Sequence, residues 1–252
     1  MEIFRFRKWV PTVSCILAVA FAPAVRAGEL YFSGDVRISG GFGDSSGSTP
    51  FFDTSGSDSD SSPVFGGAFG FATPMNRMFP DGWELDLPSW VVRTEVEGLG
   101  GRDYELTTEG ADPVHSDVTS WSLMQNVWLD IPLREPITWA LGRVPILEPL
   151  SFQLGAGVGF GSNDVDVTDN VFTGSETAYN FVYQAGAGLG YALTESVTFS
   201  VGYRYVDLGE VEVSLSDGPN AFGNLTLDLS AHEVATTLRV HFYPVPLPWS
   251  ER

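Results

Sequence analysis

Apolar and polar residues alternate with a period of two along much of the chain. In residues 150–161 (LSFQLGAGVGFG) every even position is apolar, and every odd position after Ser151 is Gly or Gln. Residues 180–191 repeat the pattern with the parity reversed, and residues 197–208 follow after a short connection. A period of two over about ten residues indicates a β-strand with two unlike faces.

Eight segments pass the same test, near residues 30–40, 63–73, 89–98, 120–131, 150–161, 180–191, 197–208 and 229–242. An even number of strands, each about ten residues long, matches a barrel whose tilted strands cross a bilayer. A soluble sandwich or a lipocalin-like barrel would show the same alternation with its apolar face turned inward. After residue 27 no window offers 18 consecutive apolar residues, so helical membrane spans are excluded.

The composition of the two faces decides between these all-β architectures. The apolar faces carry large aromatic residues near strand ends, as in the interfacial girdles of membrane barrels; these are Trp90, Trp121, Tyr191, Tyr203 and Phe242. The opposite faces are rich in Gly and would make a poor solvated surface. We therefore predict one eight-stranded antiparallel up-and-down transmembrane β-barrel over residues 28–242.

Charged residues of the polar faces would then point into a narrow lumen. An interior closed by eight strands is just wide enough to be filled by side chains. The inward set is nearly balanced, as buried ions require, and consists of Asp35, Arg37, Arg93, Glu95, Glu97, Asp130, Arg204, Glu233 and Arg239. Strand glycines would give room for the arginines and for Trp128. The sequence thus predicts a charge-paired plug.

The N-terminus has the pattern of a secretory signal peptide. A basic cluster precedes the apolar run from Cys15 to Ala22, and Val25-Arg26-Ala27 forms a cleavage site, so residues 1–27 are expected to be removed. The run is too short for a transmembrane anchor. Cys15 lies inside it, away from a lipoprotein position, and the mature chain would contain no cysteine. Disulfides, thiolate metal sites and thiol catalysis are then excluded.

The quoted strands also resemble a known family. The stretches GAGVGFG, YNFVYQAGAGLGYALTESVTFSVGYRYVDLG and LRVHF make residues 121–242 similar to outer-membrane β-barrel proteins of the opacity and surface-antigen type. The resemblance implies a barrel in the outer membrane of a Gram-negative-type cell, with both termini in the periplasm and no enzymatic activity. It implies that Phe242 is the terminal aromatic read by the assembly machinery, followed by a Pro-rich tail over residues 243–252. The connections at 74–88 and 132–149 are longer than the short periplasmic turns of such barrels.

Acidic residues concentrate in the four connections expected to face outward. Without residues 1–27 the chain keeps nine arginines, no lysine and 31 acids, a formal charge of −22. Residues 41–62, 99–119, 162–179 and 209–229 each carry −4, and together −16. This charge opposes binding to nucleic acid. Hydrated acidic loops are the simplest reading, and calcium binding is the alternative, with Asp58, Asp60, Asp164 and Asp166 as weak candidate ligands.

Enzyme signatures are weak. His115, His232 and His241 have serines or acids beside them in sequence, but adjacency in an extended chain does not assemble a catalytic triad. The alternating glycines lack the third glycine of a nucleotide-binding loop and precede no helix pattern. We expect no cofactor and a structural or adhesin- and antigen-like surface role, in contact with outer-membrane lipid and with an extracellular ligand or host surface. The alternatives are a small porin-like diffusion channel and a lipid-modifying enzyme.

Overall fold

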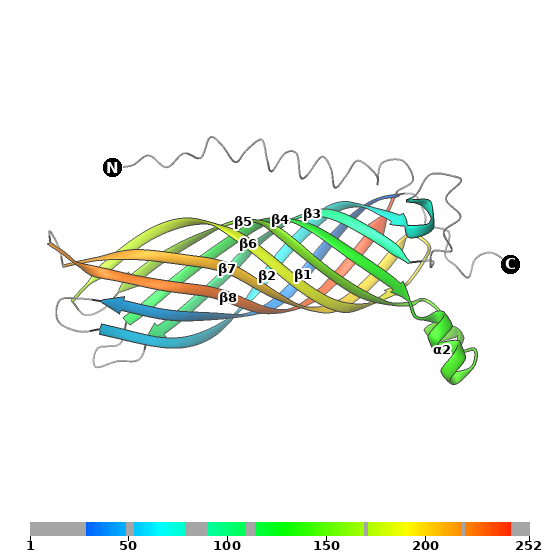
Figure 1. The fold of residues 1–252 in the computed structure, drawn as a ribbon, viewed down its shortest axis with the longest axis horizontal. Helices are drawn as coiled ribbons and strands as arrows, with labels where there is room; N and C mark the ends of the chain where they lie inside the picture. The colour runs from blue at the N-terminus through cyan, green and yellow to red at the C-terminus, as the bar shows by residue number, and fades with distance from the viewer. Residues whose placement is uncertain are drawn as a thin grey trace.

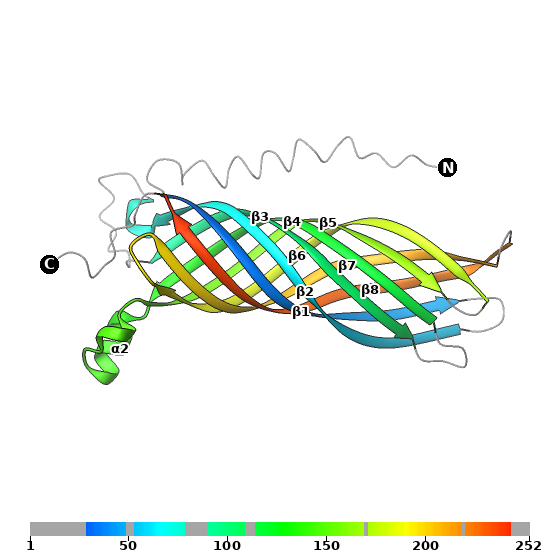
Figure 2. The same ribbon diagram turned by 180° about the vertical axis from the view of Figure 1, so that it is seen from behind.

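The computed structural model describes residues 29–48, 53–78, 90–108, 114–168, 171–217 and 220–242. They form a closed antiparallel barrel in which each strand pairs with its neighbours in sequence and β1 closes on β8 (Figures 1 and 2). The strands are β1 (Glu29–Ser48), β2 (Asp53–Pro74), β3 (Val91–Thr108), β4 (Val114–Pro132), β5 (Leu150–Thr168), β6 (Thr173–Ala192), β7 (Val197–Asp217) and β8 (Asn220–His241). The predicted architecture is confirmed. The signal peptide and the tail after Phe242 lie outside the described residues.

The strands are about twice as long as predicted, with 18 to 22 residues each. The expectation that residues 41–62, 99–119, 162–179 and 209–229 form loops is wrong, because most of these residues continue the strands. The connections from β1 to β2, β3 to β4, β5 to β6 and β7 to β8 meet at one end of the barrel, here called the outer end. The other, inner end carries helix α2 (Arg134–Leu141) and the short 3-10 helices η3 (Met75–Arg77) and η4 (Pro145–Leu147).

The apolar side chains of the barrel change sides along its length: they point outward in the inner half and inward in the outer half. In β7, Phe199, Val201 and Tyr203 point outward on the inner half, whereas on the outer half Glu210 and Glu212 are exposed. The inward residues change from polar to apolar at the same level. The outward apolar band, here called the apolar belt, includes Phe32, Val36, Ile38, Phe65, Phe69, Leu123, Val127, Leu154, Val158, Phe181, Leu189, Phe199, Val201, Leu238 and Val240.

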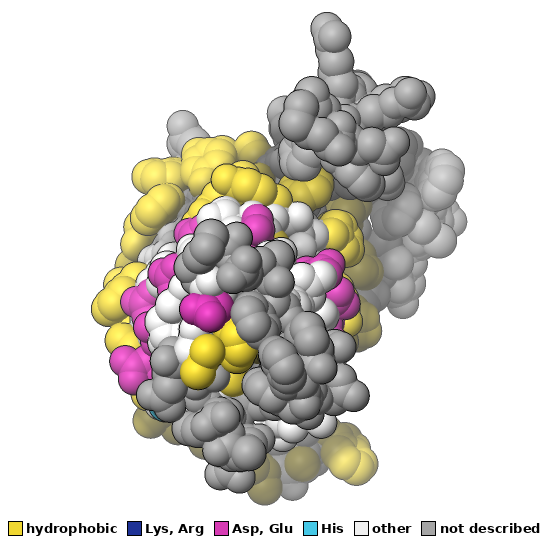
Figure 3. All heavy atoms as spheres, turned by 90° about the vertical axis from the view of Figure 1, so that its left-hand side faces the viewer, with side chains coloured by type: hydrophobic (Ala, Val, Ile, Leu, Met, Phe, Trp, Pro, Cys, Tyr) yellow, Lys and Arg dark blue, Asp and Glu magenta, His cyan; other side chains and the backbone are white. Residues whose placement is uncertain are grey.

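The outer half of the barrel has an ordinary hydrophobic interior. This outer core is formed by Tyr104, Leu106, Val114, Val118, Met124, Val165, Val167, Phe172, Val182, Val206, Leu208, Val211, Val213, Leu215, Leu225, Leu227, Leu229 and Ala231. Acidic side chains cover its outside, as the end-on view shows (Figure 3). The two halves therefore follow opposite solvation rules: the inner half suits a lipid environment, and the outer half suits water.

Two β-bulges keep the inward faces in phase where the halves meet. The register of β3 against β4 shifts between Leu99 and Arg102, and that of β7 against β8 shifts between Asp207 and Gly209. Gly101 and Gly209 have φ values of 83° and 82°, a backbone region that favours glycine. The extra residue brings Arg102 and Val211 to the inside, although their parity alone would point them outward.

Side chains replace the backbone ladder between β2 and β3 in the outer half. Backbone pairing of these strands ends at Phe65 and Gly100. Beyond it, Ser62 Oγ, Asp60 Oδ2 and Asp58 Oδ2 accept hydrogen bonds from the backbone N–H groups of Asp103, Glu105 and Thr107, at 3.1, 3.0 and 2.6 Å. Both the acceptors and the donors are two residues apart along their strands. The three bonds therefore follow one another like the rungs of a ladder, and they are called rungs below.

Candidate functional site

The most distinctive polar feature of the barrel is a buried charge network in the inner half of the lumen. Its ten members are Asp35, Arg37, Arg93, Glu95, Glu97, Arg102, Asp130, Arg204, Glu233 and Arg239, five of each sign. They project inward from β1, β3, β4, β7 and β8. In nine of them the direction follows from alternation, because the polar positions within each strand point to the same face, and Arg102 points inward because of the bulge. Most are less than a tenth exposed.

One tier of the network is centred on Arg37, whose side chain is fully buried. Its guanidinium donates to Asp35 at 2.5 Å, to Glu233 at 2.7 Å and to Glu97. Glu233 also accepts from Arg102 Nε at 2.8 Å. Three carboxylates thus surround one guanidinium, which compensates for the loss of water on burial.

Glu97 joins this tier to the opposite wall of the barrel. It accepts from Arg204 Nη1 at 2.8 Å with both oxygens, from Asn126 Nδ2 at 2.9 Å and from Gln184 Nε2 at 3.0 Å. These partners lie on β7, β4 and β6. A single carboxylate therefore cross-links the lumen from β1 to β7.

A second tier lies nearer the inner end. Arg93 donates to Asp130 at 2.8 and 3.1 Å and to Glu95 at 3.2 Å, whereas Arg239 reaches Asp130 only at 3.4 Å. Glu95 also accepts from the Tyr31 hydroxyl at 2.6 Å and from Trp128 Nε1 at 2.8 Å. Guanidinium groups of this tier also face aromatic rings, with Arg93 5.6 Å from the Trp128 centroid.

Glycines give the large lumenal side chains their room. A Cβ at Gly155 would lie 2.2 Å from the Trp128 ring, and one at Gly157 would lie 1.9 Å from Asn126 Oδ1. Above this level the lumen is closed by the outer core, with the Tyr104 hydroxyl 2.7 Å from Ser39 Oγ. The lumen is therefore filled by charged and polar side chains in its inner half and by apolar side chains in its outer half.

All nine lumenal residues named from the sequence lie in the network, and Arg102 is the member that sequence reasoning missed. It had been assigned to an outward loop, and the only signal for its true direction was Gly100-Gly101, which allows the bulge. Tyr31, Asn126 and Gln184, which also bond to the network, were not singled out either. The plug was predicted from parity, whereas the bulge depends on backbone geometry.

The five aromatic residues predicted to form interfacial girdles lie at two levels along the barrel. Trp121 and Tyr203 are about half exposed where the apolar belt gives way to acidic residues, and Phe242 is exposed at the inner end. Trp90 and Tyr191 are half-buried, also at the inner end. Their positions mark the two edges of the belt, where amphipathic rings suit a membrane interface.

The candidate calcium ligands do not converge. Among the described residues no group of three His, Cys, Asp or Glu side chains could hold a metal ion. Asp58 and Asp60 bind backbone amides as rungs between β2 and β3, and Asp164 and Asp166 are exposed on β5. Within the part of the chain that is described, the hydrogen bonds of His115 and His232 run to Thr107 and Tyr203 and form no catalytic triad.

The barrel and its lipid-facing belt agree with comparisons to known proteins. A family model described as the outer membrane protein beta-barrel domain matches residues 12–242. The chain belongs to this family. The apolar belt of this outer-membrane barrel therefore meets membrane lipid, and the outer half extends beyond it. None of the described helices is long and apolar enough to span a bilayer.

Solved structures of outer-membrane proteins are similar to this chain at low sequence identity. The outer membrane protein OprG from Pseudomonas aeruginosa is 14% identical, with a TM-score of 0.54, and the match covers 86% of this chain and 97% of that one. Neisserial surface protein A is 14% identical over 82% and 97%, with a TM-score of 0.41. The Escherichia coli outer membrane protease OmpT is 10% identical over 84% and 97%, with a TM-score of 0.42. A search of the curated proteins finds no significant match.

Proposed function

We propose that this outer-membrane barrel is a non-enzymatic structural and surface-interaction protein that acts through its outer half. The observation that supports this role is the double closure of the lumen, by the charge network and by the outer core. A barrel filled in this way offers solutes no wide axial path, whereas its outer half presents a large exposed wall. A rigid β-scaffold that carries variable connections is a common arrangement for recognition at a surface.

The charge of the outer wall narrows the class of extracellular partner. Eleven acidic side chains are exposed there, namely Asp44, Asp103, Glu105, Asp117, Asp164, Asp166, Glu176, Glu210, Glu212, Asp217 and Asp228, and three more, Asp58, Asp60 and Asp207, are half-buried. Arg102, the basic residue of this region, points inward. The described outer wall is therefore suited to a cationic partner and repels nucleic acid and other polyanions.

Membrane assembly would use the inner end of the last strand. Phe242 follows β8, its backbone N–H donates to Leu30 O at 3.0 Å, and its ring is exposed. An exposed aromatic at this place is suited to recognition by the assembly machinery, which we propose as the periplasmic partner. The secretory signal over residues 1–27 would deliver the chain there.

A whole-cell binding screen tests the surface role. Cells that display the protein would be compared with cells that display a variant in which four exposed outer acids, Asp103, Glu105, Glu210 and Glu212, are replaced by Asn or Gln. Binding of cationic ligands or host cells should follow the outer half and fall in high salt. Equal binding by cells with and without the protein would contradict the proposal. A matched variant with Glu195→Gln, which removes an exposed acid at the inner end, should bind like the parent.

A further inference from the structure

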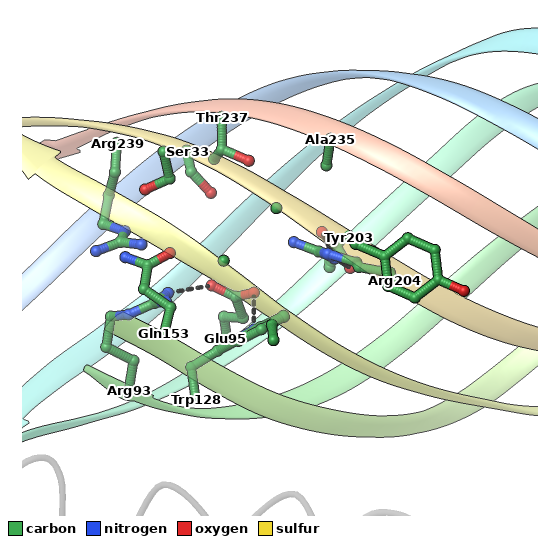
Figure 4. A pocket seen from close by; sticks show the side chains of 15 residues that line it. Ser33, Arg93, Glu95, Trp128, Gln153, Tyr203, Arg204, Ala235, Thr237 and Arg239 are labelled. Carbon is green, nitrogen blue, oxygen red and sulfur yellow. Dashed lines mark hydrogen bonds and ion pairs between the residues drawn. The ribbon is translucent and has the colours of Figure 1, made fainter. Parts of the chain in front are cut away.

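A small chamber lies beside the inner tier of the charge network. Its cavity volume is about 30 Å³, which is room for a water molecule or a small ion. The strands that line it carry residues with little or no side chain, and guanidinium groups from three of its strands reach toward it (Figure 4). The small residues are Ala187, Gly188, Gly202 and Ala235, and the arginines are Arg93, Arg204 and Arg239. The missing side chains of β6, β7 and β8 therefore create the space.

Three polar atoms of buried residues lining this chamber have no hydrogen-bond partner among the described residues. They are Gln153 Nε2, Ser200 Oγ and Arg239 Nε, and their side chains belong to residues that are 5%, 6% and 4% exposed. Buried polar groups without partners are rare and costly in native proteins. All three can donate a hydrogen bond, and Arg239 Nε can only donate.

The carboxylates of the inner tier are already used by other donors. Asp130 receives two bonds from Arg93, so that Arg239 is left with one contact at 3.4 Å. Glu95 is held by Tyr31, Trp128 and Arg93. In Figure 4 the amide of Gln153 lies between Arg239 and Arg93. The chamber thus has surplus donors near a poorly paired cation.

The donors of the lining favour a negative ligand. Asp130 pairs with Arg93 and Arg239 from outside the lining, so the charges around the chamber are equal, and the attraction for an anion comes from the three donors without acceptors. We propose that the chamber binds one small monovalent anion, of halide or nitrate size, held by Arg239 Nε, Gln153 Nε2 and the Ser200 hydroxyl. One such ion gives acceptors to the three donors. The site is independent of the proposed surface role.

Bromide provides a direct probe of the chamber. Crystals of the whole protein in detergent would be soaked in sodium bromide, and anomalous scattering would locate the ion. A peak in contact with Arg239, Gln153 and Ser200 supports the site. A water molecule there with no anomalous peak overturns it, as does bromide found only elsewhere.

Stability in vesicles gives a second readout. A ligand that binds only the folded state raises the folding constant in proportion to its concentration above the dissociation constant. Replacement of gluconate, an anion too large for the chamber, by bromide at constant sodium should therefore raise the folding constant of the parent, up to tenfold per tenfold increase in bromide. No dependence on bromide in the parent contradicts the proposal, whatever the variants do.

Variants tie this dependence to the chamber. Gln153→Glu puts a carboxylate where the anion would bind, and Ala235→Val fills part of the chamber without changing its charge. Both variants should therefore abolish the bromide effect. Ser120→Ala is the matched control, because Ser120 is a buried lumenal serine bonded to Asn163 in the outer half. It should keep the full effect. A bromide effect that survives in both chamber variants refutes the assignment.

Discussion

Glu97 is the residue whose loss should cost the charge network most. Arg37 would keep Asp35 and Glu233 after a Glu97→Gln change, but Arg204 would lose the carboxylate that pairs with it. Arg204 is 8% exposed, so its charge would remain buried without a counter-ion. Removal of one partner of a buried ion pair costs about 3 to 5 kcal/mol. We expect a loss of this size in the free energy of unfolding.

Urea unfolding in phospholipid vesicles, followed by tryptophan fluorescence, measures this loss. Glu176→Gln is the control: it removes the same charge from an exposed position on β6 and should change stability by about 0.5 kcal/mol or less. A Glu97→Gln/Arg204→Met double variant should recover part of the loss, because the unpaired cation is gone. A Glu97→Gln variant as stable as the control would refute the view that the plug depends on paired charge.

Three further changes test other parts of the barrel by the same assay. Leu227→Ala should cost about 2 to 5 kcal/mol, since Leu227 is buried in the outer core; a cost near zero would mean that the outer half contributes no packing. Gly155→Ala should be destabilising because its Cβ would meet the Trp128 ring at 2.2 Å, whereas Gly34→Ala has nothing within 4 Å and should be tolerated. Asp60→Ala removes one rung to β3 and should cost on the order of 1 kcal/mol, with faster amide exchange on β3; unchanged exchange would contradict the rung.

Parity along the strands carries most of the information that the sequence holds about this fold. It is enough to predict eight strands, the lipid-facing belt and the inward direction of Arg37 and Glu97, because a barrel wall has only two faces. The outer half was missed although period two continues there. In residues 209–217 (GEVEVSLSD), Val211, Val213 and Leu215 alternate with acidic or polar residues, and the acids suggested a loop.

Features that depend on distant contacts could not be read in this way. The rungs from Asp58 and Asp60 exist because β2 and β3 separate above Phe65, and nothing local in the acidic stretch indicates the separation. The direction of Arg102 follows from a bulge at Gly101. The chamber results from small residues on β6, β7 and β8 that come together beside Arg239 and Arg93. Each depends on register, which one strand alone does not reveal.

Planar-bilayer conductance tests the central claim that the lumen is closed. The purified, folded protein should show no current or only very small currents, because paired ions fill the inner half and Val, Leu and Met side chains fill the outer half. Leu227→Ala should stay closed, since it leaves the charge network intact. Stable, large single-channel currents from the parent protein would contradict the account and favour a diffusion channel.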